Sequence, residues 1–553
     1  MKVSEQEELP NLSDLINSLL SSIPNAQTFK GKWSSIADKL SDLNLHLSDL
    51  SDFPANSLSS QLLISLSTTL YETLSLSTLS HSPSLPNGKL KTQNDIDSLS
   101  SRLSRHVDEI DILIKSGVLQ DDAVSKTGSK TVSKRESVRV SCRNFLTRLQ
   151  IGSDPAKISA TESLNELLQE DDKNVLIAVA QGIVPVVLRL LDSNSSPQLK
   201  ENAVVLISRV SVLDSCKHVL IAEGLTLIQD LIRIIESGSG FAKEKACIAL
   251  ESLSQTRENA RAISSKGGII ALLDVCQGGT PNCQAVAASV LRNLTVFVEI
   301  REIFREEENG VLVLLGVLGS GTIRAQENVI GCLCNLCLDD ESLKLFVVKE
   351  GGVEFVMNYW DCVSSVRGLE VAVEFVRCLV SCHPIAEMIV SDGLLGRVVL
   401  VLNCNVLAVR VAAANAVCEL GYDTKTRKEL GECGCIGPLV RMLDGKAVEE
   451  KEAAAKALAM LMGYAGNRRI FKKEEKGIVS TVQLLNPLLQ NLDRKYPVSI
   501  LALFVHSKKC RKQMIASSAL VYLPKVVDMN VEGAKKLLES LGRRKLWGVF
   551  TGP

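Results

Sequence analysis

Aromatic residues are scarce in this chain, at 4% of 553 positions, although hydrophobic residues as a whole make up 46%. The apolar interior must therefore be built from leucine, valine, isoleucine and alanine, as in stacked helices. No segment sustains the alternation of apolar and polar residues that marks a half-buried strand, which excludes a β-rich fold. Because 553 residues exceed what one compact core accommodates, we expect several domains or a repeat array.

An excess of one charge is missing as well. The 62 lysine and arginine residues are matched by 63 aspartate and glutamate residues, so the whole-chain charge suggests neither nucleic acid nor membrane as a partner. The distribution is uneven, however, because 17 basic and 6 acidic residues follow position 462. A basic C-terminal region therefore stands against a mildly acidic remainder.

No export or membrane-spanning signal is recognisable. The opening residues, MKVSEQEELP, lack the apolar core of a signal peptide, and Lys2 stands where N-myristoylation requires glycine. Apolar runs such as GVLVLLGVLG are too short to cross a bilayer. Among the 16 cysteines, Cys247, Cys276 and Cys418 lie inside apolar helical patterns, as free thiols do in a reducing compartment. We expect a protein of the cytoplasm, the nucleus or both.

Motifs for catalysis or cofactor binding are lacking too. There is no Walker loop, HExxH or GxSxG, and the glycine-serine turns at 237–240 and 319–322 have no preceding strand to form a phosphate cradle. The run CLCNLC, residues 332–337, offers a single CxxC pair, which favours core packing over zinc. In CLVSCHP, residues 378–384, a helix end is favoured over a thiol–imidazole pair. We expect no enzyme activity, no metal and no cofactor.

A repeated unit is what the sequence does contain. The stretch KGGIIALLDVCQGGTPNCQAVAASVLRNLT, residues 266–295, combines a glycine turn, an apolar run, a polar turn and a second apolar run. Its opening recurs at steps of 41 to 44 residues, and the anchors are Gly182, Gly224, Gly310, Gly352, Gly393, Cys435 and Gly477. Its second run ends at steps of 41 to 43 residues, on Val210, Leu253, Leu294, Leu336, Leu379, Leu420 and Leu461, with Leu167 and Leu503 extending the series.

Each unit is predicted to be helical. Ala287, Val290, Leu291 and Leu294 have the spacing of one apolar helix face. The glycine suits a sharp reversal because it adopts positive φ without strain. One unit cannot bury its apolar face alone, so neighbouring units must stack into a continuous core.

The unit resembles the armadillo repeat. Residues 180–211, AQGIVPVVLRLLDSNSSPQLKENAVVLISRVS, and 434–462, GCIGPLVRMLDGKAVEEKEAAAKALAMLM, match that pattern closely. The resemblance covers about residues 145–545, with about nine repeats, and HEAT repeats are the alternative. It implies an all-α fold in which a helical bundle precedes a right-handed armadillo-repeat α-solenoid.

The first 120 residues break the period and are rich in leucine and serine. Four helical segments are predicted near 11–23, 32–51, 57–80 and 94–118, which suggests a bundle. We therefore expect a bundle at 1–120, a polar linker at 121–140 and the repeats at 141–553. This layout is similar to plant armadillo-repeat proteins with an N-terminal helical domain. No U-box segment is found, which argues against ubiquitin-ligase activity.

The resemblance also implies a binding surface. In armadillo arrays the third helix of each repeat lines a concave groove, where an asparagine before the final leucine pairs with an extended peptide. Only Asn293 and Asn335 keep that amide, and the tryptophan–asparagine ladder of importin-alpha is absent, which argues against a nuclear-import receptor. The alternative is that both amides only bond nearby backbone. The predicted groove residues are Ser289, Asn293, Gly331, Asn335, Glu374, Asn415 and Glu419.

The sequence thus predicts a non-enzymatic scaffold or adaptor that binds partner proteins, with an extended basic or neutral segment in the groove. The alternative is a regulatory factor that associates with membranes or nucleic acid through its basic C-terminal repeats. A solvated polar face is favoured over that alternative, because the charges are dispersed and few aromatics accompany them. The basic residues concerned are Arg468, Arg469, Lys472, Lys473, Lys508, Lys509, Arg511 and Lys512, followed by Arg543, Arg544 and Lys545. No oligomeric state is predicted.

Overall fold

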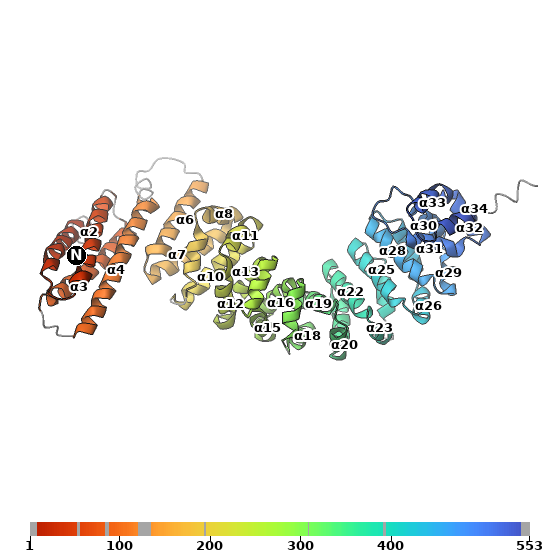
Figure 1. Ribbon diagram of the computed structural model, residues 1–553, viewed down its shortest axis with the longest axis horizontal. Coiled ribbons are helices and arrows are strands. Elements are labelled where there is room, and N and C mark those ends of the chain that lie inside the picture. Colours follow the sequence, from red (N-terminus) through yellow and green to blue (C-terminus); the bar gives the residue numbers. More distant parts are fainter. Residues whose placement is uncertain are drawn as a thin grey trace, which may run out of the picture. The chain divides into compact units, whose positions relative to one another are not determined.

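The computed structural model describes residues 8–51, 53, 56–82, 88–119, 134–192, 195–307, 309–390 and 394–542. Throughout these ranges the regular structure is helical, with no strand (Figure 1). The chain divides into two compact units, residues 1–266 and 267–553, which are described in turn. In both units consecutive helices pack on one another, so the prediction of an all-α solenoid is confirmed.

The first unit begins with four long helices around one apolar core. They are α1 (Glu8–Ser22), α2 (Lys30–Ser51), α3 (Ser57–Leu79) and α4 (Lys89–Ser116). Apolar residues recur every three or four positions, as at Ile36, Leu40 and Leu43 of α2, so one face of each helix is buried. The four predicted helices are present. The last one starts before the expected position 94, because the break lies at Gly88, whose φ is 77°.

The remainder of the first unit repeats an order of three helices. Its helices are α6 (Lys134–Ile151), α7 (Asp154–Glu170), α8 (Asp172–Ala180), α9 (Ile183–Arg189), α10 (Pro197–Ser211), α11 (Asp214–Ala222), α12 (Gly224–Ser237), α13 (Gly240–Leu253) and α14 (Arg257–Ser265). The third helices of the repeats are α7, α10 and α13, and each packs against the next. These contacts are what a stacked repeat requires to bury its apolar face.

The second unit continues the same order. Its helices are α15 (Gly268–Gly278), α16 (Pro281–Thr295), α17 (Val298–Arg305), α18 (Gly310–Ser320), α19 (Ile323–Cys337), α20 (Glu341–Lys349), α21 (Gly352–Cys362), α22 (Val366–Val380), α23 (His383–Val390), α24 (Leu394–Val401), α25 (Leu407–Leu420), α26 (Thr424–Glu432), α27 (Ile436–Leu443), α28 (Val448–Leu461), α29 (Ala465–Phe471), α30 (Gly477–Gln483), α31 (Lys495–Phe504), α32 (Lys508–Ala516), α33 (Ala519–Asp528) and α34 (Ala534–Gly542). Third helices recur from α16 to α34 at every third label, and each packs against the next.

Left-handed residues make the reversals into several second helices possible. Gly267 and Gly351 precede α15 and α21 with φ of 82° and 84°. Glycine adopts this conformation at little cost, whereas a side chain would strain it. Of the predicted anchors, Gly182 and Gly224 also have positive φ, at 80° and 60°. Gly310, Gly352 and Gly477 do not, so the conformational prediction was wrong at those three positions.

The apolar ends of the third helices form the core, as their spacing predicts. From Val210 to Leu461 every residue of that series is at most 2% exposed. The two extensions of the series were wrong by one residue. Leu503 is 42% exposed and its neighbour Phe504 is buried, and at the other end the buried residue is Leu168. Counted from Val210 and Leu461, these buried positions keep the period of 41 to 43 residues.

Several predicted features fall partly outside the described residues. The predicted linker, 121–140, is described only from Lys134, where α6 begins. Arg543, Arg544 and Lys545 lie outside the described ranges. Within those ranges no single helix is long and apolar enough to cross a membrane, although α16 and α17 pass the same test as a pair bent by 119°.

Candidate partner-binding ridge on the third helices

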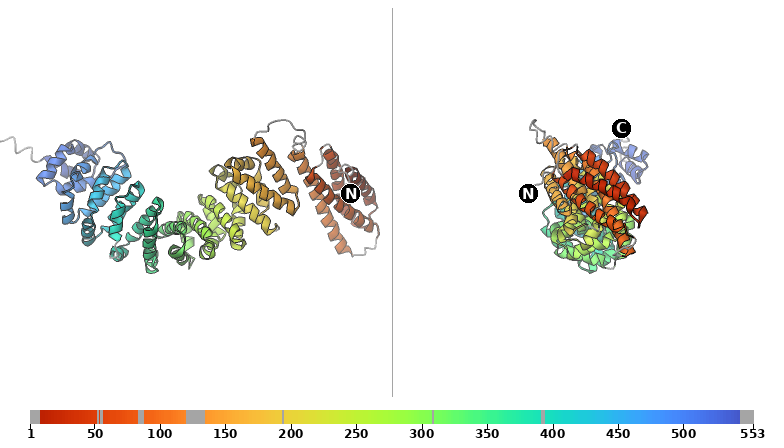
Figure 2. Two further views of the ribbon diagram at one scale, coloured as in Figure 1. Left: turned by 180° about the vertical axis from the view of Figure 1, so that it is seen from behind. Right: turned by 90° about the vertical axis from the view of Figure 1, so that its left-hand side faces the viewer.

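The predicted groove residues all lie on third helices of the second unit. α16, α19, α22, α25 and α28 follow one another in chain order, from green to cyan in Figures 1 and 2. Their apolar sides are buried, and one row of side chains on each helix stays partly exposed. We call this row the ridge, and define it by Asn293, Asn335, Glu374, Asn415, Glu419 and Lys456 with their immediate neighbours.

The position before the final apolar residue of a third helix acts mainly as a link between repeats. In the first unit, Arg209 Nε donates to the Leu168 carbonyl oxygen at 3.0 Å, and Ser252 Oγ donates to the Ser211 carbonyl oxygen at 2.5 Å. These acceptors lie at the C-terminal end of the preceding third helix, where carbonyl groups have no partner within the helix. In these two repeats, one side chain therefore satisfies a carbonyl group of the helix before it.

Asn335 makes the same kind of link in the second unit. Its Nδ2 donates to the Arg292 carbonyl oxygen at 3.1 Å and to Thr295 Oγ1 at 3.3 Å. The amide predicted to face a peptide is thus bonded to the preceding repeat. The backbone bond that the sequence left open for this residue is therefore present.

The space over Gly331 is filled by Arg292. A Cβ added to Gly331 would lie 2.5 Å from Arg292 Nε and 2.8 Å from Arg292 Cδ. The prediction gave this space to the backbone of a ligand, and here an arginine of the neighbouring helix occupies it. Arg292 Nη1 is buried there without a hydrogen-bond partner in the described chain.

The first two predicted residues, Ser289 and Asn293, are also engaged. Ser289 is only 8% exposed, and Asn293 is half-buried. Both interact with other groups of the chain. The α16 end of the ridge is therefore already occupied by the protein itself.

Glu374 is neutralised by its own helix. Its carboxylate accepts from Arg377 Nε at 3.0 and 2.9 Å and from Arg377 Nη2 at 2.5 Å. The carboxylate raises the pKa of Arg377 through these hydrogen bonds, although burial of the guanidinium opposes the shift. The pair presents a fixed, overall neutral surface on α22.

Two predicted residues on α25 differ from the others. Asn415 and Glu419, one turn apart, are half-exposed, and neither makes a side-chain hydrogen bond or ion pair within the described chain. Lys456 of α28 is half-exposed as well, and its charge acts on the Cys418 thiol together with that of Glu419. Amide, carboxylate and ammonium groups thus lie on neighbouring helices with their hydrogen-bonding capacity unused.

Acidic groups gather around the C-terminal end of α25. Tyr422 packs against His383 with ring centroids 4.8 Å apart. Burial, together with Asp423 and Glu387, raises the pKa of Tyr422 to about 12. Glu419 lies one turn earlier on the chain, so three carboxylates surround this end of α25.

The basic residues predicted in the C-terminal repeats divide into two groups. Arg468 Nε donates to the Met462 carbonyl oxygen at 2.7 Å, and Arg511 Nη2 donates to the Leu541 carbonyl oxygen at 2.6 Å. These two arginines stabilise helix ends, which carry partial negative charge. The remaining six are exposed, namely Arg469, Lys472, Lys473, Lys508, Lys509 and Lys512.

Arginines that bond a helix-end carbonyl recur along the chain, and this recurrence was not predicted from the sequence. Arg301 Nε and Arg427 Nε donate to the Thr295 and Gly421 carbonyl oxygens at 2.9 and 2.7 Å, six residues back, as Arg468 does. The three arginines are 126 and 41 residues apart, which is three periods and one period. That spacing was a readable signal for a structural role.

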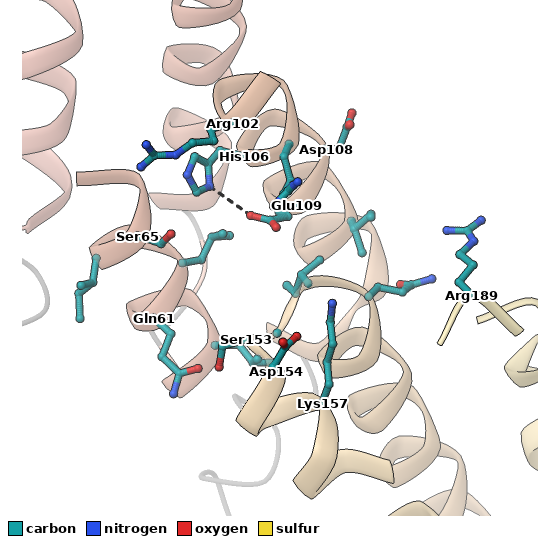
Figure 3. A pocket seen from close by; sticks show the side chains of 18 residues that line it. Gln61, Ser65, Arg102, His106, Asp108, Glu109, Ser153, Asp154, Lys157 and Arg189 are labelled. Carbon is teal, nitrogen blue, oxygen red and sulfur yellow. Dashed lines mark hydrogen bonds and ion pairs between the residues drawn. The ribbon is translucent and has the colours of Figure 1, made fainter. Parts of the chain in front are cut away.

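A cavity of about 960 Å³ lies in the first unit and was not predicted (Figure 3). Its walls come from α3, α4, the end of α6 and the start of α7. Both ring nitrogens of the buried His106 are hydrogen-bonded: Nε2 to Thr69 Oγ1 and Nδ1 to Glu109 Oε2, each at 3.1 Å. Arg102 bonds Thr69 Oγ1 at 3.0 Å and pairs with Glu72. The spacing of Arg102, His106 and Glu109 on one helix face was the sequence signal for it.

Charged side chains also line this cavity without ion-pair partners in the described residues. They are Arg105, Asp108, Asp154, Lys157 and Arg189, and Lys157 extends toward the centre in Figure 3. Both signs of charge are therefore present around the cavity. No group of three histidine, cysteine or acidic side chains that could hold a metal ion occurs in the described ranges.

Comparisons with known proteins bear on both parts of the chain. Residues 10–118 match the model of a family described as a domain of unknown function, DUF7032. No curated protein matches the chain. The crystal structure of an engineered protein is similar at 20% identity and a TM-score of 0.61, covering 75% of this chain and all of that protein. This likeness supports the helical repeat fold alone.

Proposed function

We propose that the chain is a non-enzymatic scaffold that holds an extended segment of a partner protein along the ridge. The observation that carries the proposal is the pair Asn415 and Glu419, which are half-exposed and unpaired within the described chain while the preceding positions are linked. The binding centre therefore shifts from Asn293 and Asn335 to α22, α25 and α28.

The chemistry of these groups suits an extended segment. An asparagine amide donates and accepts at once, so it can pair with both main-chain groups of one ligand residue. Glu419 and Lys456 can each hold a side chain of opposite charge. Because the helices beneath are linked repeat to repeat, the groups need little rearrangement to bind.

We also propose that the repeats are armadillo repeats. The support is the motif match in the sequence together with the stacked third helices of each unit. We propose the N-terminal bundle, whose helices α3 and α4 line one side of the cavity of Figure 3, as a second docking module for a partner. Its mixed charges fit a protein surface.

A displayed peptide library tests the proposal. The full chain would be screened against random extended peptides on phage, and the enriched peptides measured by fluorescence titration. Replacing Asn415 with alanine should weaken binding by about 5- to 150-fold, since losing one amide that pairs a buried peptide group costs about 1–3 kcal/mol. The thermal midpoint should stay the same, because the side chain has no internal bond to lose.

A matched control is Gln513→Ala, which removes a half-exposed amide from α32, away from the ridge. It should leave peptide binding unchanged. If enriched peptides bind the Asn415→Ala, Glu419→Ala double variant as well as the parent, the ridge assignment is wrong.

A further inference from the structure

A groove of about 780 Å³ lies between α6 and α8, both labelled in Figure 1, at the start of the repeats. All of its lining residues belong to the segments 134–139 and 171–181. The two helices pack against each other, and Gln181 Nε2 donates to the Arg139 carbonyl oxygen at 3.1 Å. The chain itself thus joins the two walls, so the groove is formed before any ligand binds.

The groove lies where later repeats place a first helix. In the second unit, the first helix α29 packs against α26 and α27, the first and second helices of the preceding repeat. α6 holds the place of α27, because it packs against α7, α8 and α9 as α27 packs against α28, α29 and α30. Between α4 and α6, however, the described residues include no first helix. The place that α26 takes beside α29 is therefore left without a described helix beside α8.

The floor of the groove is apolar. The apolar lining residues are Val138, Leu176, Ile177 and Ala180. Leu176 is 43% exposed. Most later first helices carry a charged residue at its position, as Arg261 and Glu302 do two and three periods along the chain, and Leu345 is the one other leucine. The first repeat thus offers an apolar contact where most other repeats are polar.

The rim of the groove is basic. The basic lining residues are Lys134, Arg135, Arg139 and Lys173, and all four are exposed. Among the described lining residues the only carboxylate is that of Asp171, and it already caps α8 by accepting from the Lys173 backbone N–H at 2.9 Å. Arg139 also pairs with Glu136 at 3.2 Å, in an exposed ion pair that is weak in water. The groove as a whole is therefore complementary to an apolar face flanked by carboxylates.

We propose that this groove is a docking site for an acidic amphipathic helix of a partner protein. The helix lies beside α8 as α26 lies beside α29, with its apolar face on Leu176 and its carboxylates near Lys173 and Arg135. α26 spans 9 residues, so two to three turns of a partner helix fill the place. A helix that lays its apolar face into a groove is a common mode of peptide recognition. The site shares no residue with the ridge, so it goes beyond the proposed function and is tested separately from it.

Two displayed libraries of helical peptides test the site on the full chain. Both libraries carry leucine at i, i+3, i+4 and i+7 on one face, and the flanking positions hold glutamate in one library and lysine in the other. We expect binders from the glutamate library, and we expect them to gain helicity on binding, as measured by circular dichroism. A glutamate library without binders, or binders that gain no helicity, would overturn the proposal. Lysine peptides that lose affinity when Leu176 is replaced would overturn it as well.

Variants with matched controls locate the binding. Leu176→Gln should weaken the glutamate peptides at least about tenfold, because a buried leucine contact is lost. Leu345→Gln, at the same place in its own repeat and also 43% exposed, should leave the affinity unchanged. If Leu176→Gln binds these peptides as the parent does while thermal melting shows both chains folded, the docking site is wrong.

Charge reversal tests the rim. Lys173→Glu should weaken the glutamate peptides severalfold at low salt and less at high salt, since the charges are exposed and screened. Lys425→Glu is the control, because Lys425 is the exposed second residue of α26 as Lys173 is of α8. Asn415→Ala should not affect these peptides. Equal losses in Lys173→Glu and Lys425→Glu, or a loss in Asn415→Ala, would show that the peptides bind elsewhere and would overturn the assignment.

Discussion

Replacing Asn335 with alanine separates a structural amide from a binding one. Asn335 donates to the Arg292 carbonyl oxygen and to Thr295 Oγ1 at 3.1 and 3.3 Å. Thr295 Oγ1 also donates to that carbonyl at 3.0 Å, so the acceptor keeps a partner when the amide is removed. The substitution thus deletes hydrogen bonds without leaving a buried group unsatisfied. We expect it to lower the free energy of unfolding by about 1 kcal/mol.

Two measurements follow this loss. Thermal melting monitored by fluorescence should show a midpoint lower by about 2–4 °C, the shift expected for 1 kcal/mol in a unit of this size class. Hydrogen exchange should accelerate where α16 ends and α19 packs against it, and not in the first unit. Peptides selected on the parent should bind the variant unchanged. A variant with parental stability and lost peptide binding would show that Asn335 faces a ligand, and would refute the linking role.

Three further predictions concern bonds between helices. Gly431→Ala should lower the free energy of unfolding by about 2–3 kcal/mol, because the new Cβ would lie 1.9 Å from Oδ1 of Asn467, whose Nδ2 donates to two carbonyl oxygens. The control in the same chemical denaturation series is Gly437→Ala, where the new Cβ would have no neighbour closer than 3.5 Å. Arg301→Met should lower the free energy of unfolding by about 1–3 kcal/mol, because the Thr295 carbonyl oxygen loses its arginine donor. Replacing the exposed Arg324 with methionine should leave that free energy almost unchanged. Equal denaturation midpoints for the two variants would contradict the capping role of Arg301. Arg397 lowers the pKa of Asp361 mainly by a hydrogen bond, so the pair stabilises the fold above the ordinary aspartate pKa of about 4 and loses this effect as pH falls through the lowered value. Arg397→Leu should therefore be less stable than the parent at pH 7, and the difference should disappear as pH falls through the lowered pKa of Asp361, as denaturation across pH would show.

The helices and the core could be predicted because both depend on short-range spacing. Apolar residues three and four apart must share one face, and two independent series with one period require stacking. The ends of the series failed by one residue, since Leu167 and Leu503 have apolar neighbours that fit the period equally well. Composition cannot choose between adjacent leucine and phenylalanine residues, whereas packing does.

The ridge was harder to predict because its partners are distant in sequence. Asn335 and Arg292 are 43 residues apart, and nothing near Asn335 shows that its amide finds that carbonyl. For the same reason the sequence predicted free space beside Gly331, whereas the side chain of Arg292 on another helix fills that space. Asn415 and Glu419 were correctly placed on a third helix. That their side chains lack hydrogen-bond partners depends on the side chains of neighbouring helices, which are distant in sequence.

The links between third helices have a consequence for how such a chain can grow. Each donor, whether Arg209, Ser252, Asn335 or Cys378, finds its acceptor one period back along the chain. A duplicated segment of one full period would meet a suitable acceptor before it and offer one after it. An insertion of half that length would displace the next donor from its carbonyl, whereas the junctions beyond the insertion would keep their spacing. Within each unit, gene duplication and loss can therefore change the number of repeats in whole steps while leaving each remaining junction intact.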